Sequence, residues 1–436
     1  MFSIFDISLQ LNGFPIQKAQ SDLEKIVALS ASEKKQFIEN QKQAIVKFHL
    51  ENNAFYQNLV GSKNDINWED LPILNKSNLQ SPLQNRLSKG YNSKNIYLNK
   101  TSGSSGEPFI FAKDKYTHAL TWASNMYRFG WFGIDFNRSL QARFYGIPLD
   151  FFGYKKERFK DFLSKRFRFP IFDLSDATLE KVLKKFEHTK FDYLNGYTSS
   201  IVLFAKFLRK RNLILKDICP TLKVCMVTSE MLFEDDKILL ETQFGIPIIN
   251  EYGASELDLI AFESPQKEWL VNSETLSVEI LDENNRVLPY GEAGRIVITS
   301  LFNKAHPFIR YDIGDIGILD EKSTLEKPIL KQLIGRTNDV SILPSGKKSP
   351  GLTFYYVTKS IIKDDGNVKE FIIKQTKIDS FEIEYVSETE LDLAQIQKIK
   401  EAIALYLEPN LHFTFIRKNT LERTARGKLK QFSSFL

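Results

Sequence analysis

The chain has 436 residues, too many for one compact hydrophobic core, so we expect one large domain with a smaller one, or two or three domains. Hydrophobic residues make up 42% and charged residues 26%, which is the composition of a globular protein and excludes a disordered chain. The 59 basic and 54 acidic residues leave a net charge of +5, too even a mixture to favour nucleic acid as a partner.

The N-terminal segment, the apolar runs and the cysteines argue against a secreted, membrane-spanning, disulfide-rich or zinc-binding protein. The N-terminal segment has no basic stretch followed by an apolar core, and no apolar run approaches the roughly 20 residues of a membrane span. We therefore expect a cytoplasmic protein. Cys219 and Cys225 lie six apart, which argues against a disulfide scaffold and against a zinc site. The histidines show no ligand spacing and are expected to be structural (His49, His118, His188, His306 and His412).

The first clear helix is predicted over 33–52. Its apolar residues recur near helical spacing (Phe37, Ile38, Ala44, Ile45 and Phe48). The pair Asn52-Asn53 is expected to end it.

The segment 101–108, Thr-Ser-Gly-Ser-Ser-Gly-Glu-Pro, has the composition of a phosphate-binding loop. Gly103 and Gly106 allow a tight turn that directs several N–H groups at one point. Small hydroxyl donors accompany the glycines (Thr101, Ser102, Ser104 and Ser105). The flanking segments 95–99 and 109–112 are predicted strands, so the loop would cap a hairpin. It is not a Walker loop, and on its own it is equally consistent with a flexible surface turn.

Two segments rich in aromatic residues follow. The first, 116–132, is predicted to be a helix. The second, 151–170, mixes Phe with Lys and Arg. This mixture can stack on nucleic acid, but we favour an amphipathic surface helix or a docking face.

Helices and strands then alternate between 175 and 250. Helices are predicted over 179–186, with Ser175 or Asp176 as the cap, and over 201–208 and 234–244. The intervening strands are predicted at 191–194, 224–227 and 246–250. Because these strands are short and apolar, we expect them to be buried in a mainly parallel sheet, which gives the α/β fold class.

Polar residues follow three of these strands: Asn-Gly-Tyr-Thr at 195–198, Thr-Ser-Glu at 228–230 and Tyr-Gly-Ala-Ser-Glu at 252–256. Ligands bind at the carboxyl ends of parallel strands, so these segments should surround one pocket. A carboxylate suits Mg²⁺, and a flat aromatic ring suits a purine. The last segment on its own could be a tight turn that carries an exposed acid.

The rest of the chain predicts a β subdomain and then a small α+β domain. Apolar alternation marks two strands through Val278, Ile280, Ile296 and Ile298. Beyond residue 339, strands are predicted at 371–374, 381–385 and 413–416 and a helix over 393–403. The chain ends near Arg-Thr-Ala-Arg-Gly-Lys at 423–428, which by itself could be a solvated basic tail.

Five motifs, taken in order, resemble those of the adenylate-forming superfamily, which includes acyl-CoA synthetases, luciferases and peptide-synthetase adenylation domains. They are the segments 101–108, 252–256, 310–315 (Arg-Tyr-Asp-Ile-Gly-Asp), 335–339 (Gly-Arg-Thr-Asn-Asp) and 423–428. The segments 49–56 and 72–79 resemble the phenylacetate-CoA ligase branch. The resemblance implies a large adenylation domain, 1–335, for ATP and the acyl substrate, and a mobile C-terminal lid, 336–436.

The resemblance also implies individual roles for residues at the nucleotide. Glu256 would hold Mg²⁺, Tyr252 would lie on the adenine, and Asp315 would accept hydrogen bonds from both ribose hydroxyls. Arg336 would lie near the nucleotide, and Ile313 replaces the usual hydroxyl residue without affecting an essential group. The remaining nucleotide contacts would come from the loop and strand ends (Thr101, Ser102, Gly103, Ser104, Ser105, Gly106, Thr228, Ser229, Glu230, Gly253, Ala254 and Ser255).

Further roles concern the acid and the lid. Lys428 would contact the acyl carboxylate and the α-phosphate, and a flexible, compact cation suits that task. Asn338 occupies the hinge position, where relatives commonly carry Asp or Lys; Asn tolerates unusual backbone angles, so hinge motion is expected to survive. Tyr197 and its neighbours would line the acid pocket.

The implied reaction joins ATP and a carboxylic acid into acyl-AMP with release of pyrophosphate, and then transfers the acyl group to a thiol, usually CoA. Relatives with Gly-Glu-Pro in the first loop, as at Glu107, are often encoded among surface-polysaccharide genes, so an amine or hydroxyl on a sugar or carrier is an alternative acceptor. A catalytically silent nucleotide-binding protein is a further alternative. The sequence does not identify the acid or the oligomeric state.

Overall fold

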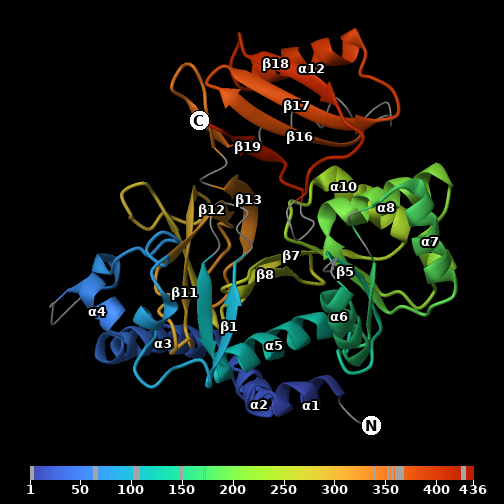
Figure 1. Ribbon diagram of the computed structural model, residues 1–436. Helices are drawn as coiled ribbons and strands as arrows, with labels where there is room; N and C mark the ends of the chain where they lie inside the picture. The colour runs from blue at the N-terminus through green and yellow to red at the C-terminus, as the bar shows by residue number, and fades with distance from the viewer. Residues whose placement is uncertain are drawn as a thin grey trace. The chain divides into compact units, whose positions relative to one another are not determined.

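A computed structural model describes residues 4–61, 67–101, 109–146, 151–169, 171, 173–336, 340–350, 354, 358, 368–423 and 429–436 (Figure 1). The N-terminal part is helical, with α1 (Ile4–Leu11), α2 (Ile16–Val27), α3 (Ala31–Asn52) and α4 (Ala54–Val60), followed by two short 3₁₀ helices (Trp68–Asp70 and Leu83–Asn85). The predicted helix over 33–52 is confirmed. It begins earlier because Ser30 and Glu33 form a capping box, in which each side chain accepts a hydrogen bond from the other residue's backbone N–H.

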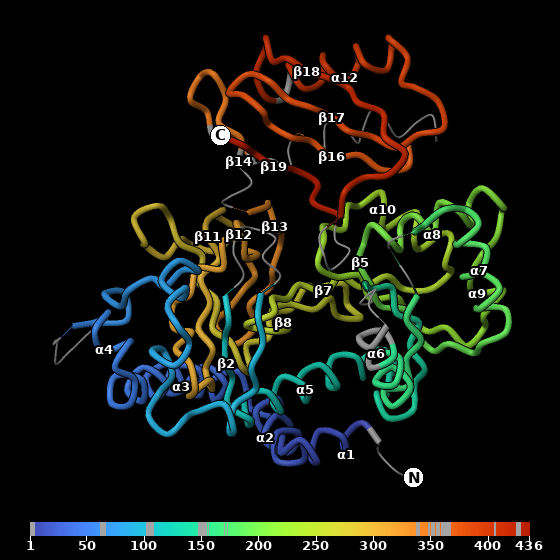
Figure 2. Tube along the Cα trace, viewed as in Figure 1, coloured from blue at the N-terminus to red at the C-terminus, as the bar shows by residue number. Residues whose placement is uncertain are grey.

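The predicted hairpin is also confirmed. Strands β1 (Ile96–Lys100) and β2 (Ile110–Asp114) pair antiparallel, with Lys100 opposite Ile110. Strand β2 leads directly into α5 (Lys115–Gly130), as the trace in Figure 2 shows. The side chain of Asp114 caps this helix by accepting a hydrogen bond from the N–H of Thr117 at 2.8 Å. This capping hydrogen bond therefore fixes the backbone at the junction between β2 and α5.

A seven-stranded sheet in the order β4-β3-β5-β6-β7-β8-β9 forms the α/β part. Its strands are β3 (Gln141–Phe144), β4 (Arg166–Phe169), β5 (Tyr193–Tyr197), β6 (Val224–Thr228), β7 (Ile248–Ala254), β8 (Asp258–Glu263) and β9 (Trp269–Val271). The pairs from β4 to β7 are parallel, whereas β8 and β9 are antiparallel to their neighbours. The predicted mainly parallel sheet is confirmed, and its edge strand β4 lies beside α6 (Phe151–Leu163), the helix predicted within 151–170.

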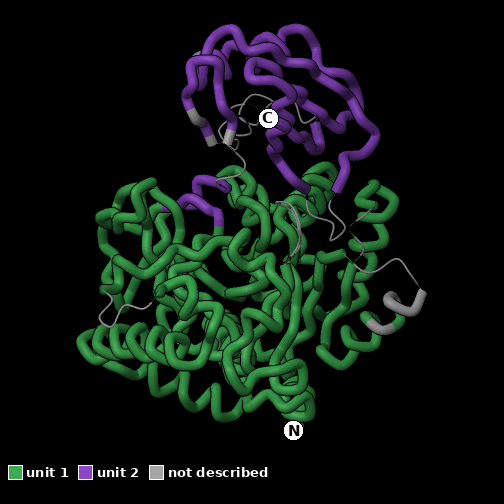
Figure 3. Tube along the Cα trace, turned by 60° about the vertical axis from the view of Figure 1, so that its left-hand side comes forward, with its two compact units in different colours: residues 1–313, 318–331 green, residues 314–317, 332–436 purple. Residues whose placement is uncertain are grey.

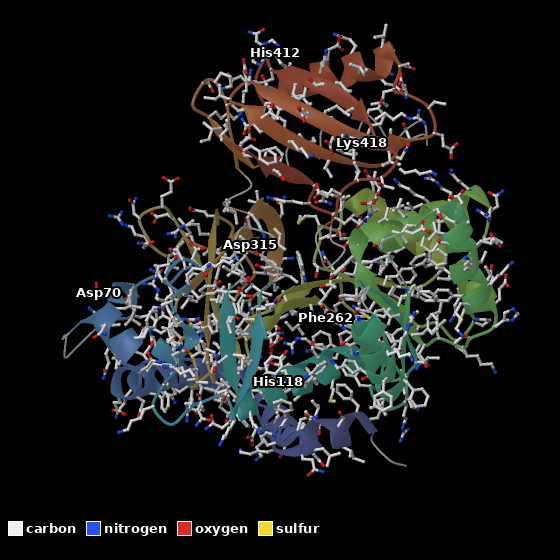
Figure 4. The ribbon with its side chains drawn as sticks, in the orientation of Figure 1. Asp70, His118, Phe262, Asp315, His412 and Lys418 are labelled. Atoms are coloured by element: carbon white, nitrogen blue, oxygen red, sulfur yellow. The ribbon has the colours of Figure 1, made fainter. Side chains whose placement is uncertain are left out.

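Helices cover both faces of this sheet. On one face, α7 (Asp176–Glu187), α8 (Thr198–Lys210) and α10 (Glu234–Phe244) enclose the main core; the short helix α9 (Leu215–Ile218) adds to it. On the other face, the end of α5 packs Phe129 against Phe262 of β8, which is labelled in Figure 4. The two cores follow from the alternation of side chains along each strand.

Gly196 lets β3 and β5 approach each other. A Cβ atom at this position would lie 2.5 Å from the Cβ of Phe144 on the neighbouring strand, which no side chain can accommodate. The polar segment at the end of β5 therefore contains a glycine that is required for strand pairing.

A second sheet, in the order β10-β11-β12-β13, matches the predicted β subdomain. Its strands are β10 (Leu276–Leu281), β11 (Ala293–Ser300), β12 (Tyr311–Leu319) and β13 (Leu330–Arg336). In the antiparallel pair β10–β11, Val278 lies opposite Ile298 and Ile280 opposite Ile296, so the four residues that predicted these strands are direct partners.

The chain divides into two compact units, Met1–Ile313 with Ile318–Lys331, and Gly314–Gly317 with Gln332–Leu436 (Figure 3). The second unit contains the hairpin β14 (Val340–Ile342) and β15 (Lys348–Pro350), and a sheet in the order β18-β17-β16-β19. The sheet strands are β16 (Val368–Lys377), β17 (Ser380–Ser387), β18 (His412–Arg417) and β19 (Phe432–Ser434).

Helix α12 (Leu393–Tyr406) packs on this sheet and places Ile399 and Ile403 in the core of the unit with Ile373 and Ile383. The predicted α+β fold of the C-terminal part is confirmed. No helix among the described residues is both long enough and apolar enough to cross a membrane.

Candidate functional site

Thr101 closes the loop end of the β1–β2 hairpin. Its N–H donates to the carbonyl oxygen of Phe109 at 3.0 Å, and the N–H of Phe109 donates to the hydroxyl oxygen of Thr101 at 3.1 Å. The two ends of the predicted phosphate loop are therefore held together. The loop residues predicted to contact phosphate, Ser102, Gly103, Ser104, Ser105 and Gly106, lie outside the described residues.

The predicted segment 228–230 follows β6 and contacts the start of α8. The carboxylate of Glu230 accepts a hydrogen bond from the N–H of Ser199 at 2.7 Å, and its carbonyl oxygen accepts one from the hydroxyl of Thr198 at 3.1 Å. A carboxylate at a helix N-terminus is favourable because N–H groups are unsatisfied there. Ser229 has a positive φ of 70°, which directs the chain back from the strand toward the helix.

The predicted segment 252–256 lies at the end of a strand rather than in an open loop. Strand β7 continues to Ala254 and turns tightly into β8, so that Gly253 lies opposite Leu259. A Cβ atom on Gly253 would lie 2.6 Å from the carbonyl oxygen of Asp258, so the turn requires glycine. The Tyr252 ring is largely buried and contacts Trp269 edge-on, with ring centroids 6.2 Å apart.

Glu256 follows this turn and is 8% exposed. The hydroxyl of Tyr311 donates to its Oε1 atom at 3.0 Å, which orients the carboxylate. The ammonium group of Lys113 forms an ion pair with Asp258, and burial lowers the pKa of Lys113 to about 7 while the charge of Glu256 opposes that shift. Thr121 also donates to Asp258, at 3.0 Å. Strand β2, helix α5 and the β7–β8 turn therefore meet around Glu256.

A small polar cavity of about 20 Å³ adjoins this carboxylate. Glu256, Lys113, Ser300 and three threonines are among its lining residues. The volume suffices for about one water molecule. Hydroxyl and carboxylate oxygens are suitable partners for water or for a hard cation.

Mg²⁺ usually binds one or two carboxylates and takes its other ligands from phosphates and water. Glu256 would supply one such carboxylate. Among the residues that the structure describes, no group of three or more His, Cys, Asp or Glu side chains could hold a metal ion without a substrate. A metal at Glu256 would therefore depend on bound phosphates.

Asp315 and Arg336 contact each other in the second unit. The Nε atom of Arg336 lies 3.3 Å from Oδ1 of Asp315, which is labelled in Figure 4. Asp315 is 8% exposed, and the Arg336 side chain is 43% exposed. The hinge residue Asn338 lies outside the described residues.

Lys428 also lies outside the described residues, but the chain on both sides of it is packed. Leu421 and Leu429 are buried together with Ile372 of β16. Arg423, the first residue of the terminal motif, forms an ion pair with Glu370 of the same strand. The two ends of the motif are therefore attached to one strand of the second unit.

Comparisons with known proteins agree with the predicted superfamily. No family model matches the chain. It is 24% identical to protein CapK of Staphylococcus aureus over 419 residues, which are 91% of this chain and 88% of CapK. It is 24% identical to the phenylacetate-coenzyme A ligase of Aromatoleum evansii over 231 residues, 48% of this chain and 51% of that ligase.

Among solved structures, the chain is similar to 2-hydroxyisobutyryl-CoA ligase in the postadenylation state, in complex with R3-HIB-AMP. The TM-score is 0.70 at 17% identity, over 92% of this chain and 90% of the other. The chain has the fold of the adenylate-forming ligases. The resemblance predicted from the motifs and the α/β fold class predicted from the alternation of helices and strands are confirmed.

Three polar residues at the carboxyl edge of the sheet in this adenylate-forming fold were not predicted from the sequence: Arg143, Tyr145 and Glu251. Arg143 lies opposite Asn195 in the β3–β5 pair, and Glu251 lies opposite Thr228 in the β6–β7 pair. Burial raises the pKa of Glu251, against a hydrogen bond from Thr228 and the charge of Arg143. Residues 141–144 show no apolar pattern, so the sequence carried no clear signal for this strand or its cation.

Tyr197, which was predicted to line the acid pocket, lies beside these residues. Its ring contacts Tyr145, with centroids 4.7 Å apart, and its backbone lies opposite Thr228. Side chains from β3, β5, β6 and β7 therefore meet at one edge of the sheet.

Proposed function

We propose that this protein activates a carboxylic acid with ATP and Mg²⁺ as an acyl-AMP, releases pyrophosphate, and transfers the acyl group to a thiol, for which CoA is the first candidate. The observation that carries the proposal is the environment of Glu256. Its carboxylate is oriented by Tyr311 in a polar cavity, next to the strand that follows the predicted phosphate loop. The similarity to ligases that form acyl-AMP supports the same chemistry.

In the first half-reaction, a carboxylate oxygen of the acid attacks the α-phosphorus of ATP, and the bond to the pyrophosphate oxygen breaks. Bound Mg²⁺ would neutralise phosphate charge. Glu256 would hold that ion, and backbone N–H groups of the loop closed by Thr101 would orient the phosphates. The contribution of the protein is therefore positioning and charge neutralisation. We propose that residues 1–335 perform this step and that 336–436 act as a mobile lid.

Asp315→Ala is expected to weaken ATP binding by about 1.5–3 kcal/mol, the range for hydrogen bonds to a charged group. The reason is that the carboxylate would accept hydrogen bonds from both ribose hydroxyls. Calorimetric titration with ATP and 2′-deoxy-ATP measures the effect. Equal affinity of the wild type for both nucleotides, together with normal ATP binding by the variant, would assign Asp315 a structural role beside Arg336.

Lys428→Ala is expected to slow acyl-AMP formation by about 100-fold, the scale for removal of one preorganised electrostatic contact, while supplied acyl-AMP is still consumed with CoA. Asn338→Pro should affect the second step instead, because proline fixes φ near −65° and would prevent rotation at the hinge. Single-turnover assays of the two half-reactions separate these effects. Loss of the same step in both variants would contradict a lid with two positions.

The second candidate function is transfer of the acyl group to an amine or hydroxyl, for example on a sugar or a carrier. Glu107 in the Gly-Glu-Pro segment favours it through the resemblance, given with the sequence motifs, to relatives encoded among surface-polysaccharide genes. An acid-dependent ATP/pyrophosphate exchange screen tests the first step for both candidates. Addition of CoA then distinguishes the acceptors. A chain that binds ATP but exchanges no pyrophosphate with any acid would be a silent nucleotide-binding protein.

A further inference from the structure

Arg143 places a cation at the carboxyl edge of the parallel sheet. It lies on β3 opposite Asn195 of β5, and residues in register on neighbouring strands share a face of the sheet. Its guanidinium group lies 4.2 Å from the centre of the Tyr145 ring. Tyr145 in turn contacts Tyr197, so Arg143 belongs to the group of side chains around the proposed acid pocket.

The neighbouring arginines have carboxylate partners. On β4, Arg166 pairs with Asp161 at 2.5 Å, and Arg168 pairs with Asp161 at 3.0 Å and with Glu157 at 2.9 Å. Both acids come from α6. They neutralise the two arginines of the edge strand, and Arg143 lies outside this network.

Arg143 itself forms no ion pair or hydrogen bond with any residue in the described part of the chain, and its Nε atom is buried without a partner. Glu251 is close enough for the two charges to influence each other, but not within ion-pair distance. A buried donor without a partner is costly, and such a group calls for an explanation. The guanidinium group lies over the Tyr145 ring, and the planar edge of a guanidinium group can bind two oxygens at once.

We propose that Arg143 binds a second anionic group of the acid, so that the substrate is a dicarboxylic acid or an acid with another anionic substituent. This inference rests on the proposed function, because it assigns the substrate of the same site. The reacting carboxylate would lie at the α-phosphate, and the second anion would lie on the guanidinium edge of Arg143. An aliphatic or aryl acid without that group would leave the cation unpaired.

The test is pyrophosphate exchange with pairs of acids of equal carbon number in which a carboxylate replaces the terminal methyl group, such as butanoate with succinate and pentanoate with glutarate. The variants are Arg143→Met and Arg143→Lys. Arg138→Met is the matched control, since the side chain of this nearby arginine is 70% exposed and pairs with Asp135. Thermal unfolding of each variant shows whether it is folded and as stable as the wild type.

The wild type is expected to prefer the dicarboxylate. Arg143→Met should lower kcat/KM for it by about 10- to 100-fold, mainly through KM, the range for a charge-assisted hydrogen bond. The same variant should lower kcat/KM for the monocarboxylate much less, so that the preference for the dicarboxylate falls, and Arg143→Lys should retain part of that preference. Arg138→Met should change neither acid.

A wild type that uses monocarboxylates equally well, or an Arg143→Met variant that loses both acids alike, would overturn the inference and leave the proposed function intact. Absence of exchange with every acid would contradict the proposed function and the inference together. The ratio of kcat/KM for the dicarboxylate to kcat/KM for the monocarboxylate is the decisive measurement, because a purely structural role of Arg143 would not change it.

Discussion

Glu256→Gln is expected to lower kcat for acid-dependent pyrophosphate exchange by about 10³-fold, the upper range for loss of one electrostatic contact to a transition state. The substitution removes the charge that would hold Mg²⁺ on the phosphates but keeps the shape of the side chain. The amide oxygen can still accept the hydrogen bond from Tyr311, so the fold should be unchanged. Exchange rates measured against Mg²⁺ concentration, with thermal unfolding alongside, give both results.

Tyr311→Phe is the matched control for this experiment. It removes the hydrogen bond to Glu256 and leaves the carboxylate in place. We expect a smaller loss of activity, of about 10- to 100-fold, because a hydrogen bond to a charged group contributes roughly 1.5–3 kcal/mol. Full exchange activity in Glu256→Gln would refute the metal assignment.

Arg128→Met is expected to lower the free energy of unfolding of the large unit by about 3–5 kcal/mol, the range for removal of one partner of a buried ion pair. The Nη2 atom of Arg128 lies 2.6 Å from Glu274, and both residues are buried. Lys34 is the second cation on Glu274, at 2.7 Å. The variant leaves the buried carboxylate with this one cation. Urea unfolding of the wild type and the variant measures the difference.

The effect should depend on pH. Burial raises the pKa of Glu274, but Arg128 and Lys34 outweigh it and lower the pKa from 4.5 to about 2. A carboxylate with a lowered pKa stabilises the fold above its unfolded pKa, and that contribution is lost as the pH falls through its folded pKa. The difference between wild type and Arg128→Met should therefore be largest near pH 7 and shrink below about pH 4.5. Arg138→Met, at an exposed pair, should have little effect at any pH.

The sequence predicted helices and strands correctly where the spacing of apolar residues alone identifies the element. The helix predicted over 234–244 has the bounds of α10, and the alternation of Val278, Ile280, Ile296 and Ile298 identified two directly paired strands. Strand β3 was not predicted, because its four residues include Gln141 and Arg143 and lack an apolar pattern. Its place in the sheet depends on pairing with β4 and β5, which are distant in the chain.

The candidate site also combines features that the sequence predicted with features that only the tertiary structure decided. Motif order alone indicated the superfamily and named Glu256, because a carboxylate after Tyr-Gly-Ala-Ser is a local feature of the chain. That Tyr311 orients this carboxylate, that Lys113 and Asp258 pair beside it, and that the Nε atom of Arg143 is buried without a partner were decided only by tertiary structure. These contacts join residues up to 145 positions apart. Local sequence carries periodicity and motif chemistry, whereas the partner of a buried charge depends on which distant strands and helices pack against it.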